Sequence, residues 1–472
     1  MSFTGVSFLF AFLPALLTVY YLLPVRLRAV RNFVLLGASL FFYAWAGPDF
    51  LLLLLGSAAL NYLAGLLVAG GSRSRKRAVL VLAVLCNLAL LGWFKYAGFF
   101  ADILNGAGLA VPMPQIVLPL GISFFTFQAI SYVADVYRGA VPAQKNPLWV
   151  ALYLSFFPRL VAGPIARYPD FRADLDGRRE SVDAFVGGAV RFLFGMAKKL
   201  LLANTLAQVA DAAYATKLGE LSTAMAWLGA AAYTLQIYLD FSAYSDMAIG
   251  LGKMFGFHFP ENFDYPYVAR SITEFWRRWH ITLSSWFRDY VYIPLGGSRC
   301  TLPRQLLNLL VVWCLTGFWH GAAWSFVAWG LYYAVILMGE RYLWGKAVER
   351  LPSPLRRVYT LFIVLLGWVL FRSGGAEQIT GMLGALFGLR GMGLGSDQAL
   401  YFLLEYRWEL AVGILACLPV KRWLSGSLER RQTAWGDLAL LWGPRLLALL
   451  FGAFALARMV SSGFNPFIYA NF

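Results

Sequence analysis

The sequence predicts an all-α membrane protein, a polytopic transmembrane helical bundle that forms a single domain over residues 1–472. Three observations lead to this prediction. The chain is 60% hydrophobic and only 14% charged, whereas an average soluble domain is about 45–50% apolar and about 25% charged. Apolar stretches near the ~20 residues that cross a bilayer recur from end to end. No long polar block lies between them that could form a separate soluble domain.

Candidate spans follow one another along the chain, and the first covers residues 3–23. This stretch lacks a basic segment and a small-residue cleavage site, so we expect a retained first helix and not a signal peptide. Some later stretches are too short or too polar to cross fully, so we expect about eleven crossings plus re-entrant or interfacial helices. The remaining candidate spans are 32–46, 49–69, 78–95, 118–134, 148–166, 184–204, 223–250, 306–322, 325–343, 358–372, 407–419 and 446–460.

The net charge of +16 does not indicate a nucleic-acid-binding protein, because the Lys and Arg residues lie in short clusters between apolar spans. Such clusters are typical of cytoplasmic loops under the positive-inside rule. Placing every cluster on the cytoplasmic side predicts a consistent path with both termini extracytoplasmic. The clusters are Arg26/Arg28/Arg31, Arg73/Arg75/Lys76/Arg77, Arg270/Arg277/Arg278, Arg299/Arg304, Lys346/Arg350/Arg356/Arg357 and Lys421/Arg422/Arg430/Arg431.

Residues 261–300 are too charged to cross bare lipid, yet they carry aromatic residues at helix-like spacing. We expect amphipathic helices at the cytoplasmic interface, followed by a turn at Gly296 and Gly297. This interfacial segment, about 261–304, lies within a motif-rich core of about 118–345.

A second irregular stretch is "YLSFFPRLVAGPIARYPDF" (153–171). Pro158, Gly163 and Pro164 interrupt a would-be helix, and Arg159 lies in its apolar run. The pattern predicts a broken or re-entrant helix.

The stretch "LTGFWHGAAWSF" places His320 among apolar, aromatic and small residues, in a chain with only 3 histidines. An imidazole at membrane depth must be hydrogen-bonded or face water, and ionisable groups there are functional candidates. A core histidine that bonds a backbone carbonyl is the alternative. Gly317 and Gly321 allow another backbone or a ligand to come close, and Trp319 and Trp324 supply bulky walls. We expect these four to bind substrate beside a general base.

His280, in "FWRRWHITLSSWFRDY", is the second catalytic candidate. Arg277, Arg278 and Arg288 would lower its pKa if they lie close in space, and the imidazole would then stay neutral. A supporting catalytic role and a histidine snorkelling at the interface are equally open. Arg277 and Arg278 are also candidates for substrate binding. The third histidine, His258, lies beside a Pro-containing turn, and we assign it a structural role.

Residues 233–250, "YTLQIYLDFSAYSDMAIG", predict a polar stripe. Gln236, Asp240 and Tyr244 recur at every fourth position, so they share one helical face. The stripe lines a cavity or makes interhelical hydrogen bonds, and the sequence does not choose between these. A buried Asp240 needs a partner, such as an arginine of segment 270–288. The candidate substrate-binding residues outside the histidine stretches are Tyr238, Asp240, Tyr244 and Asn308.

Other catalytic chemistries have no matching motif. The sequence contains no Walker A loop, no GxSxG elbow, no HExxH and no carboxylate-rich metal box. Its 4 cysteines are scattered without a CxxC or a Cys/His cluster, which indicates neither a zinc site nor a disulfide framework. We therefore expect no metal site.

Four stretches together resemble the membrane-bound O-acyltransferase (MBOAT) family, and specifically its bacterial branch of alginate O-acetyltransferase membrane subunits. They are "FFPRLVAGPI", "YTLQIYLDFSAYSDMAIG", "ENFDYPYVARSITEFWRRWHITLSSWFRDYVYIPLGGSR" and "LTGFWHGAAWSFVAWGLYY". The stretches "FLFAFLPALLTVYYLLP" and "LPLGISFFTFQAISYVADVYRG" (118–139) resemble the same branch. The resemblance therefore covers nearly the whole chain, and the joint match is highly specific.

The resemblance implies funnels from both membrane faces that meet at a histidine matching His320, with a second polar position matching His280. It implies acetyl-coenzyme A as a cytoplasmic acyl donor, a substrate and not a permanently bound cofactor. His320 would act as general base on the acceptor hydroxyl. His280 would support it by hydrogen bonding or by aiding departure of the thiolate. Basic residues such as Arg270, Arg277 and Arg278 would attract the anionic nucleotide.

The donor is cytoplasmic, whereas the polysaccharides modified in this branch lie outside, so acetyl groups must pass across the membrane. The resemblance implies a multi-pass protein of the cell inner membrane that serves an alginate-like exopolysaccharide. It also implies a separate extracytoplasmic SGNH or serine-hydrolase-like acetyltransferase that completes the transfer. This sequence contains no such domain, so we expect that protein as a partner.

Three alternatives stay open. Within the family, the chain resembles peptidoglycan O-acetyltransferase subunits and transferases that move D-alanine toward teichoic acid. A channel or transporter without chemistry would use similar polar residues for permeation. Such transporters often contain internal repeats, and none of 20 to 50 residues stands out here.

Overall fold

The structure, a computed structural model, describes residues 1–45, 47–389 and 393–461. This part of the chain is helical and contains no β-strand, so the predicted all-α class is confirmed. The chain falls into two compact units. Unit 1 comprises the described residues of 1–192 together with 247–260, and unit 2 comprises 193–246 and the described residues from Glu261 onward.

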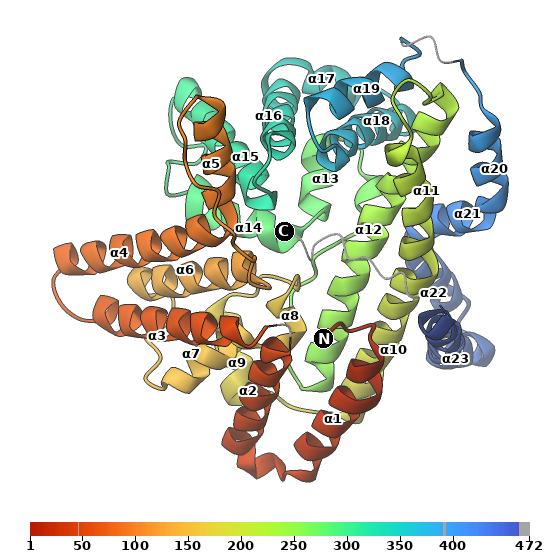
Figure 1. Cartoon of the computed structure of the whole chain (residues 1–472). Coiled ribbons are helices and arrows are strands. Elements are labelled where there is room, and N and C mark those ends of the chain that lie inside the picture. Colours follow the sequence, from red (N-terminus) through yellow and green to blue (C-terminus); the bar gives the residue numbers. More distant parts are fainter. Residues whose placement is uncertain (46, 390–392, 462–472) are drawn as a thin grey trace. The chain divides into compact units, whose positions relative to one another are not determined.

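Unit 1 contains short N-terminal helices followed by longer ones. In chain order the helices are η1 (Phe8–Phe12), α1 (Leu13–Leu22), η2 (Val25–Leu27), α2 (Arg28–Ala44), α3 (Asp49–Ala69), α4 (Arg73–Leu91), η3 (Gly92–Tyr96), α5 (Ala97–Gly106), α6 (Ile122–Arg138), α7 (Pro147–Ser155), α8 (Phe157–Leu160), α9 (Tyr168–Gly177) and α10 (Val182–Ala197), whose last residues belong to unit 2. Helices α3, α4 and α6 pack against one another, and α7 packs on α2 and α3 (Figure 1).

Local sequence signals explain where several of these helices start. The Asn146 side chain accepts a hydrogen bond from the backbone N–H of Leu148 at 3.0 Å, and Pro147 occupies the first helical position of α7. At that position the missing N–H of proline costs nothing. Helix α6 begins after Gly121, which has φ 71°. A Cβ at Gly121 would lie 2.3 Å from the carbonyl oxygen of Leu160, so only glycine fits this close approach.

The predicted break within residues 153–171 is confirmed. Helix α7 ends at Ser155, and α8 is a separate short helix with Pro158 in its first turn. Arg159 is fully buried there and donates hydrogen bonds to the carbonyls of Tyr153 and of Ala166, the latter at 3.3 Å. Its guanidinium also lies 4.5 Å from the centroid of the Tyr153 ring. The arginine in an apolar run therefore satisfies buried backbone carbonyls beside the helix break.

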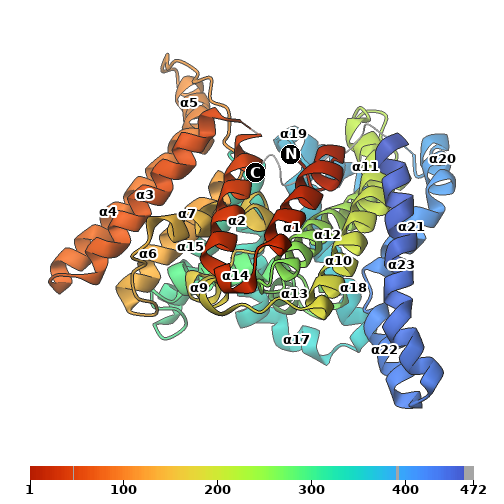
Figure 2. The ribbon, with the colours of Figure 1, turned by 90° about the horizontal axis from the view of Figure 1, so that it is seen from below.

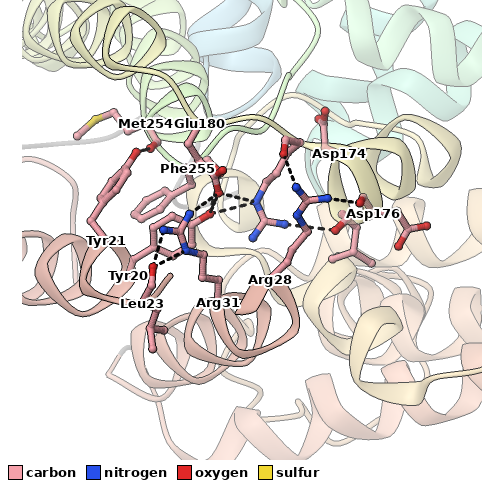
Figure 3. A network of polar contacts seen from close by, with 12 residues as sticks. Tyr20, Tyr21, Leu23, Arg28, Arg31, Asp174, Asp176, Glu180, Met254 and Phe255 are labelled. Carbon is pink, nitrogen blue, oxygen red and sulfur yellow. Dashed lines mark hydrogen bonds and ion pairs between the residues drawn. The ribbon is translucent and has the colours of Figure 1, made fainter. Parts of the chain in front are cut away.

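A buried polar network joins α1, α2 and the chain before α10 in unit 1 (Figure 3). Glu180 accepts a hydrogen bond from the Tyr20 hydroxyl at 2.6 Å and pairs with Arg31 at 3.0 Å and Arg178 at 3.5 Å. Burial alone would raise the pKa of Glu180, but the hydrogen bond from Tyr20, a backbone N–H and the charges of Arg178 and Arg31 together lower it. Arg31 of the first basic cluster therefore has a structural partner and is only 3% exposed.

Unit 2 contains the segments that carry the predicted site. Its helices are η4 (Lys198–Ala203), α11 (Asn204–Ala215), α12 (Thr223–Met254, whose last residues belong to unit 1), η5 (Pro266–Val268), α13 (Ile272–Arg278), α14 (Ile281–Phe287), η6 (Arg288–Tyr292), α15 (Leu302–His320), α16 (Trp324–Gly339), η7 (Glu340–Trp344), α17 (Gly345–Arg350), α18 (Ser353–Arg372), α19 (Ala376–Leu386), α20 (Asp397–Glu405), α21 (Arg407–Ala416), α22 (Val420–Arg431) and α23 (Ala434–Ser461).

Helices α15 and α16 pack extensively against each other, and α18 packs on α16 and α13. Helix α22 leads through a turn into the long helix α23 (Figure 2). The segment 261–304 forms the short helices η5, α13, α14 and η6, as expected for a part of the chain too charged to cross the bilayer. Gly296 and Gly297 have φ values of 110° and 56°, which confirms the predicted turn.

Five helical segments in the described part of the chain are long and apolar enough to cross a membrane. They are Val25–Ala44, Asp49–Ala69, Arg73–Gly106, Ser353–Arg372 and Ala434–Ser461, and a shorter apolar helix covers Phe8–Leu22. Several other predicted spans are helical but shorter, since α16 has 16 residues and the span 148–166 is broken. The number of about eleven crossings therefore stays a prediction.

Candidate active site

His280 lies at the junction of α13 and α14. Helix α13 begins after Ser271, whose hydroxyl accepts a hydrogen bond from the backbone N–H of Glu274 at 3.0 Å. After Arg278 the helix ends, and His280 adopts φ 43° and ψ 53° before α14 begins at Ile281. This left-handed conformation costs a non-glycine residue about 1–2 kcal/mol. The surrounding contacts must therefore hold the turn that presents His280.

His320 is the last residue of α15, and aromatic rings surround it. Its ring lies edge-on to Trp329 and Phe371, with centroids 5.1 and 5.3 Å away. The ring of Trp319 lies at 5.0 Å. Since the side chain is only 2% exposed, these rings restrict the directions in which the imidazole can point.

Both histidines line one cavity of about 280 Å³ within unit 2. Its walls come from α13, α14, α15 and the region around η7. Trp276 and Trp313 supply apolar wall, and their ring centroids lie 4.7 Å apart. Two histidines that are distant in the sequence therefore line the same cavity, which neither stretch indicates alone.

Arg277, Arg288 and Arg341 line the same cavity. Arg288 pairs with Asp289 at 2.7 Å, and Arg341 donates hydrogen bonds to Tyr292 and Gln305, both at 3.4 Å. Among the described residues that line the cavity none is Asp or Glu. Guanidinium groups in the cavity wall can attract an anionic ligand.

The His280 imidazole is neutral at neutral pH. It is 1% exposed and lies outside the candidate membrane spans, and burial lowers its pKa well below the usual value. Its Nδ1 lies 3.1 Å from Oδ1 of Asn262. The expected neutral state thus follows from burial and not from Arg277, Arg278 and Arg288. A snorkelling histidine would keep its ring at the surface, so the buried ring favours the catalytic-support interpretation.

Glu340, the first residue of η7, holds the start of α13. Its carboxylate accepts hydrogen bonds from the backbone N–H groups of Ile272 and Thr273, both at 2.8 Å, and from the Thr273 hydroxyl at 2.6 Å. The first N–H groups of a helix have no partner within the helix, and an anion satisfies them well. This contact joins the helix that carries Arg277 to the residue that precedes Arg341.

The arrangement suits acyl transfer that depends on protein side chains. A neutral imidazole that lines the cavity can accept a proton from a hydroxyl group. The guanidinium groups can bind an anionic substrate and stabilise negative charge that develops on it. Within the described ranges, no group of three or more His, Cys, Asp or Glu residues could hold a metal ion.

Comparison with known proteins identifies the family of this chain. The family model described as MBOAT, membrane-bound O-acyltransferase family, matches residues 140–364, which include both histidines. A probable alginate O-acetylase of Azotobacter vinelandii is 40% identical over the whole of both chains. The chain belongs to the membrane-bound O-acyltransferase family. It is therefore an O-acyltransferase and a multi-pass membrane protein.

Other relatives show which MBOAT proteins are similar. A probable alginate O-acetylase of Pseudomonas aeruginosa is 46% identical over 82% of this chain and 75% of its own. A peptidoglycan O-acetyltransferase of Helicobacter pylori is 36% identical over 82% of this chain and 80% of its own. The resemblance to the alginate O-acetylase branch, stated from the sequence, is thus confirmed.

The structure places the glycines of the MBOAT histidine stretch against another helix. A Cβ at Gly317 would lie 2.3 Å from the carbonyl oxygen of Phe326 and 3.2 Å from Cα of Gly330. A Cβ at Gly321 would lie 2.1 Å from the Phe326 ring. These glycines therefore allow α15 and its partner α16 to approach closely. Trp324 is 64% exposed and does not line the cavity.

The polar stripe of α12 contacts η4. Asp240 is 1% exposed and pairs with Lys199 at 2.7 Å, so its partner is a lysine of η4 and not an arginine of segment 270–288. In the same way Asp246 pairs with Lys198 at 2.6 Å. Tyr238 is buried among aromatic rings, and its centroid lies 5.3 Å from that of Tyr267. The described contacts of the stripe are thus interhelical.

Three further expected binding residues do not line the cavity. The Tyr244 side chain of α12 is buried, at 7% exposure. Arg278 pairs with Glu274 at 2.9 Å and Asp264 at 3.2 Å. The Asn308 amide donates to the carbonyls of Leu295 and Gly297, both at 3.2 Å, and so stabilises the turn after η6. Of the expected binding residues, Arg277 lines the cavity together with both histidines.

The residues Asn262, Arg288, Glu340 and Arg341, in or beside this cavity, were not assigned a site role from the sequence. Arg341 and Glu340 follow an apolar span, where they resemble an ordinary basic and acidic helix end. Asn262 lies at the start of the charged segment, and Arg288 was considered only for its effect on His280. The sequence signal for Glu340 was its position directly after an apolar helix. This position does not show that its carboxylate contacts the start of α13.

Proposed function

We propose that this protein moves an acetyl group from cytoplasmic acetyl-coenzyme A across the cell inner membrane for O-acetylation of an alginate-like exopolysaccharide. The observation that carries the proposal is the cavity shared by His280, His320 and three arginines. Relatives named probable alginate O-acetylase support the polysaccharide class. Positive charge at the cavity supports a donor with phosphate groups.

His320 acts in this proposal as the general base on the acceptor hydroxyl. The hydroxyl oxygen attacks the thioester carbonyl while its proton passes to an imidazole nitrogen of His320. The C–O bond forms, the C–S bond breaks, and the thiol departs with a proton. A cavity of about 280 Å³ lies just below the about 300–1,000 Å³ of ordinary ligand pockets. It therefore suits the thioester end of the donor and a hydroxyl.

His280 supports this step from the junction of α13 and α14. It hydrogen-bonds a reacting group or aids departure of the thiolate. Arg277, with Arg288 and Arg341, binds the anionic part of the donor. These roles give the two histidines and the three arginines of the cavity a place in one reaction.

A partner protein completes the transfer outside the membrane. We infer an extracytoplasmic serine-hydrolase-like acetyltransferase, because the donor is cytoplasmic and the polymer is outside. Both termini are extracytoplasmic in this proposal, since every basic cluster then faces the cytoplasm. Acetyl-coenzyme A binds as a substrate and not as a resident cofactor.

The test uses purified protein with labelled acetyl-coenzyme A and candidate polysaccharides, with and without its genomic partner. His320→Ala should lower acetyl transfer by about 10²–10⁴-fold, the usual contribution of a general base. His258→Ala is the matched control, because His258 does not line the cavity and pairs with Asp174 at 2.9 Å. Retained transfer in a correctly inserted His320→Ala protein would end the assignment.

A peptidoglycan O-acetyltransferase subunit is the second candidate function, and the 36% identical Helicobacter pylori relative favours it. The same assay separates the two when alginate and peptidoglycan fragments are compared as acceptors. A transporter without chemistry would neither hydrolyse nor exchange the label of acetyl-coenzyme A, so either reaction argues against it.

A further inference from the structure

Asn262 is fully buried and lies between α12 and α14. Its Nδ2 donates a hydrogen bond to the Ser245 hydroxyl at 3.2 Å. On the other side of the amide, Oδ1 accepts from the Thr282 hydroxyl at 2.9 Å and from the Thr282 backbone N–H at 3.3 Å. A backbone N–H can only donate, so the amide atom that faces it must be the oxygen. The amide of Asn262 therefore has one allowed orientation.

This orientation decides how His280 carries its proton. Nδ1 of His280 lies 3.1 Å from the same Oδ1 atom, and an amide oxygen can only accept. Nδ1 must therefore carry the hydrogen. In a neutral imidazole the other nitrogen, Nε2, then carries a lone pair and is an acceptor.

The backbone of Asn262 supports the same turn. Its carbonyl accepts a hydrogen bond from the N–H of Ile281 at 3.0 Å, directly after His280 in its left-handed conformation. Two residues further on, the N–H of Asp264 donates to the carbonyl of Arg278 at 2.9 Å. Side chain and backbone together thus hold both the position and the proton of the ring.

We propose that Asn262 is a positioning residue that holds His280 in the Nδ1–H tautomer, so that His280 acts in the cavity through Nε2 as a hydrogen-bond acceptor. The catalytic consequence rests on the function proposed above. His280 then cannot protonate the departing sulfur. The proton of the acceptor hydroxyl passes to His320 and from His320 to the sulfur, while the C–O bond forms and the C–S bond breaks. During this step the Nε2 atom of His280 accepts a hydrogen bond in the cavity.

The first test is ¹⁵N NMR of the full-length protein in nanodiscs with ¹⁵N-labelled imidazole rings. The chain has 3 histidines, so His258→Gln and His320→Gln variants assign the remaining signals to His280. We expect a protonated Nδ1 and an unprotonated Nε2 at neutral pH. A protonated Nε2 in the unsubstituted protein would overturn the proposal, and this measurement needs no substrate.

Two variants at Asn262 test whether this residue sets the tautomer of His280. Asn262→Asp keeps an oxygen beside Nδ1, and the Ser245 hydroxyl can rotate to donate to it, so we expect the same tautomer and transfer within about tenfold. Asn262→Ala removes the acceptor beside Nδ1, so the Nε2–H tautomer of His280 should appear. Acetyl transfer should fall about 10²-fold, the scale seen in other enzymes when a residue that orients a histidine is lost. An Asn262→Ala protein that keeps both the tautomer and full transfer would also overturn the proposal.

Asn87→Ala is the matched control for folding. Asn87 is also buried, pairs with Asn61 at 2.8 Å and does not line the cavity, so its loss should lower thermal stability without changing the His280 signals. The two proposals fail separately. If His320→Ala retains transfer while the Nδ1–H tautomer is observed, the proposed function falls and the tautomer assignment stands.

Discussion

Glu340→Ala should destabilise the start of α13 and disturb the cavity. The substitution removes the acceptor of three hydrogen bonds, from the N–H groups of Ile272 and Thr273 and from the Thr273 hydroxyl. Ile272 is fully buried and Glu340 is 8% exposed, so water replaces these bonds poorly. Each buried donor left unsatisfied costs about 1–3 kcal/mol. Removing the buried charge also removes its desolvation cost, which offsets part of the loss.

We therefore expect Glu340→Ala to lower the free energy of unfolding by about 3 kcal/mol. Glu340→Gln keeps one acceptor oxygen, and the Thr273 hydroxyl can rotate to accept from its amide, so its loss should be about half as large. Helix α13 carries Arg277, and Arg341 follows Glu340, so the KM for the acyl donor should rise in both variants. If the capping contact holds α13, the free energy of unfolding should be lowest for Glu340→Ala, higher for Glu340→Gln and highest for the unsubstituted protein.

Denaturant unfolding of the detergent-solubilised protein measures the stability, and donor-dependent acetyl transfer measures KM. Glu349→Ala is the matched control, because Glu349 is an exposed acidic residue on α17. If Glu340→Ala unfolds like the unsubstituted protein and keeps its KM, the contact does not hold α13 and the reasoning is wrong.

Two further predictions follow from the packing and the charges. Gly317→Ala places a Cβ 2.3 Å from the Phe326 carbonyl oxygen and should destabilise α15 against α16 by about 1–3 kcal/mol. Gly187→Ala, where no atom lies within 4 Å, should change the same unfolding curve little. The pKa of Glu180 is lowered in the folded protein, so its stabilising contribution is present above the unfolded value of 4.5 and is lost as the pH falls through the folded value. Glu180→Gln should remove this acid dependence of thermal stability, and an unchanged dependence between about pH 5 and pH 2 would contradict the assignment.

The fold was predicted best where the signal is local. Composition identified a helical membrane protein, because apolar stretches of this length are stable only in lipid or in a large core. Proline marked the break before Pro158, because it fixes φ and lacks an N–H donor. Glycine marked the turn at Gly296 and Gly297, because it permits positive φ. The boundaries of α3, at Asp49–Ala69, match the predicted span 49–69.

The partners of polar groups were predicted less well. Asp240 needed a cation, but Lys199 and the arginines of segment 270–288 were equally available in the sequence. Gly317 permits close approach, yet its conformational freedom does not say whether a ligand or a helix approaches. Only the packing of α15 on α16 answers this. Pairing of this kind depends on contacts between distant residues, which periodicity along one helix does not contain.

The sequence by itself determined that this chain is an all-α membrane protein. It also singled out His320 and His280 as catalytic candidates, because a histidine in an apolar or interfacial run is costly unless it has a polar partner or a function. The tertiary structure decided that the two histidines and three arginines share one cavity. It also decided that Glu340 holds α13 and that Asn262 orients His280. These contacts join residues far apart in the chain, and they form only when packed helices bring buried donors and acceptors within hydrogen-bond distance.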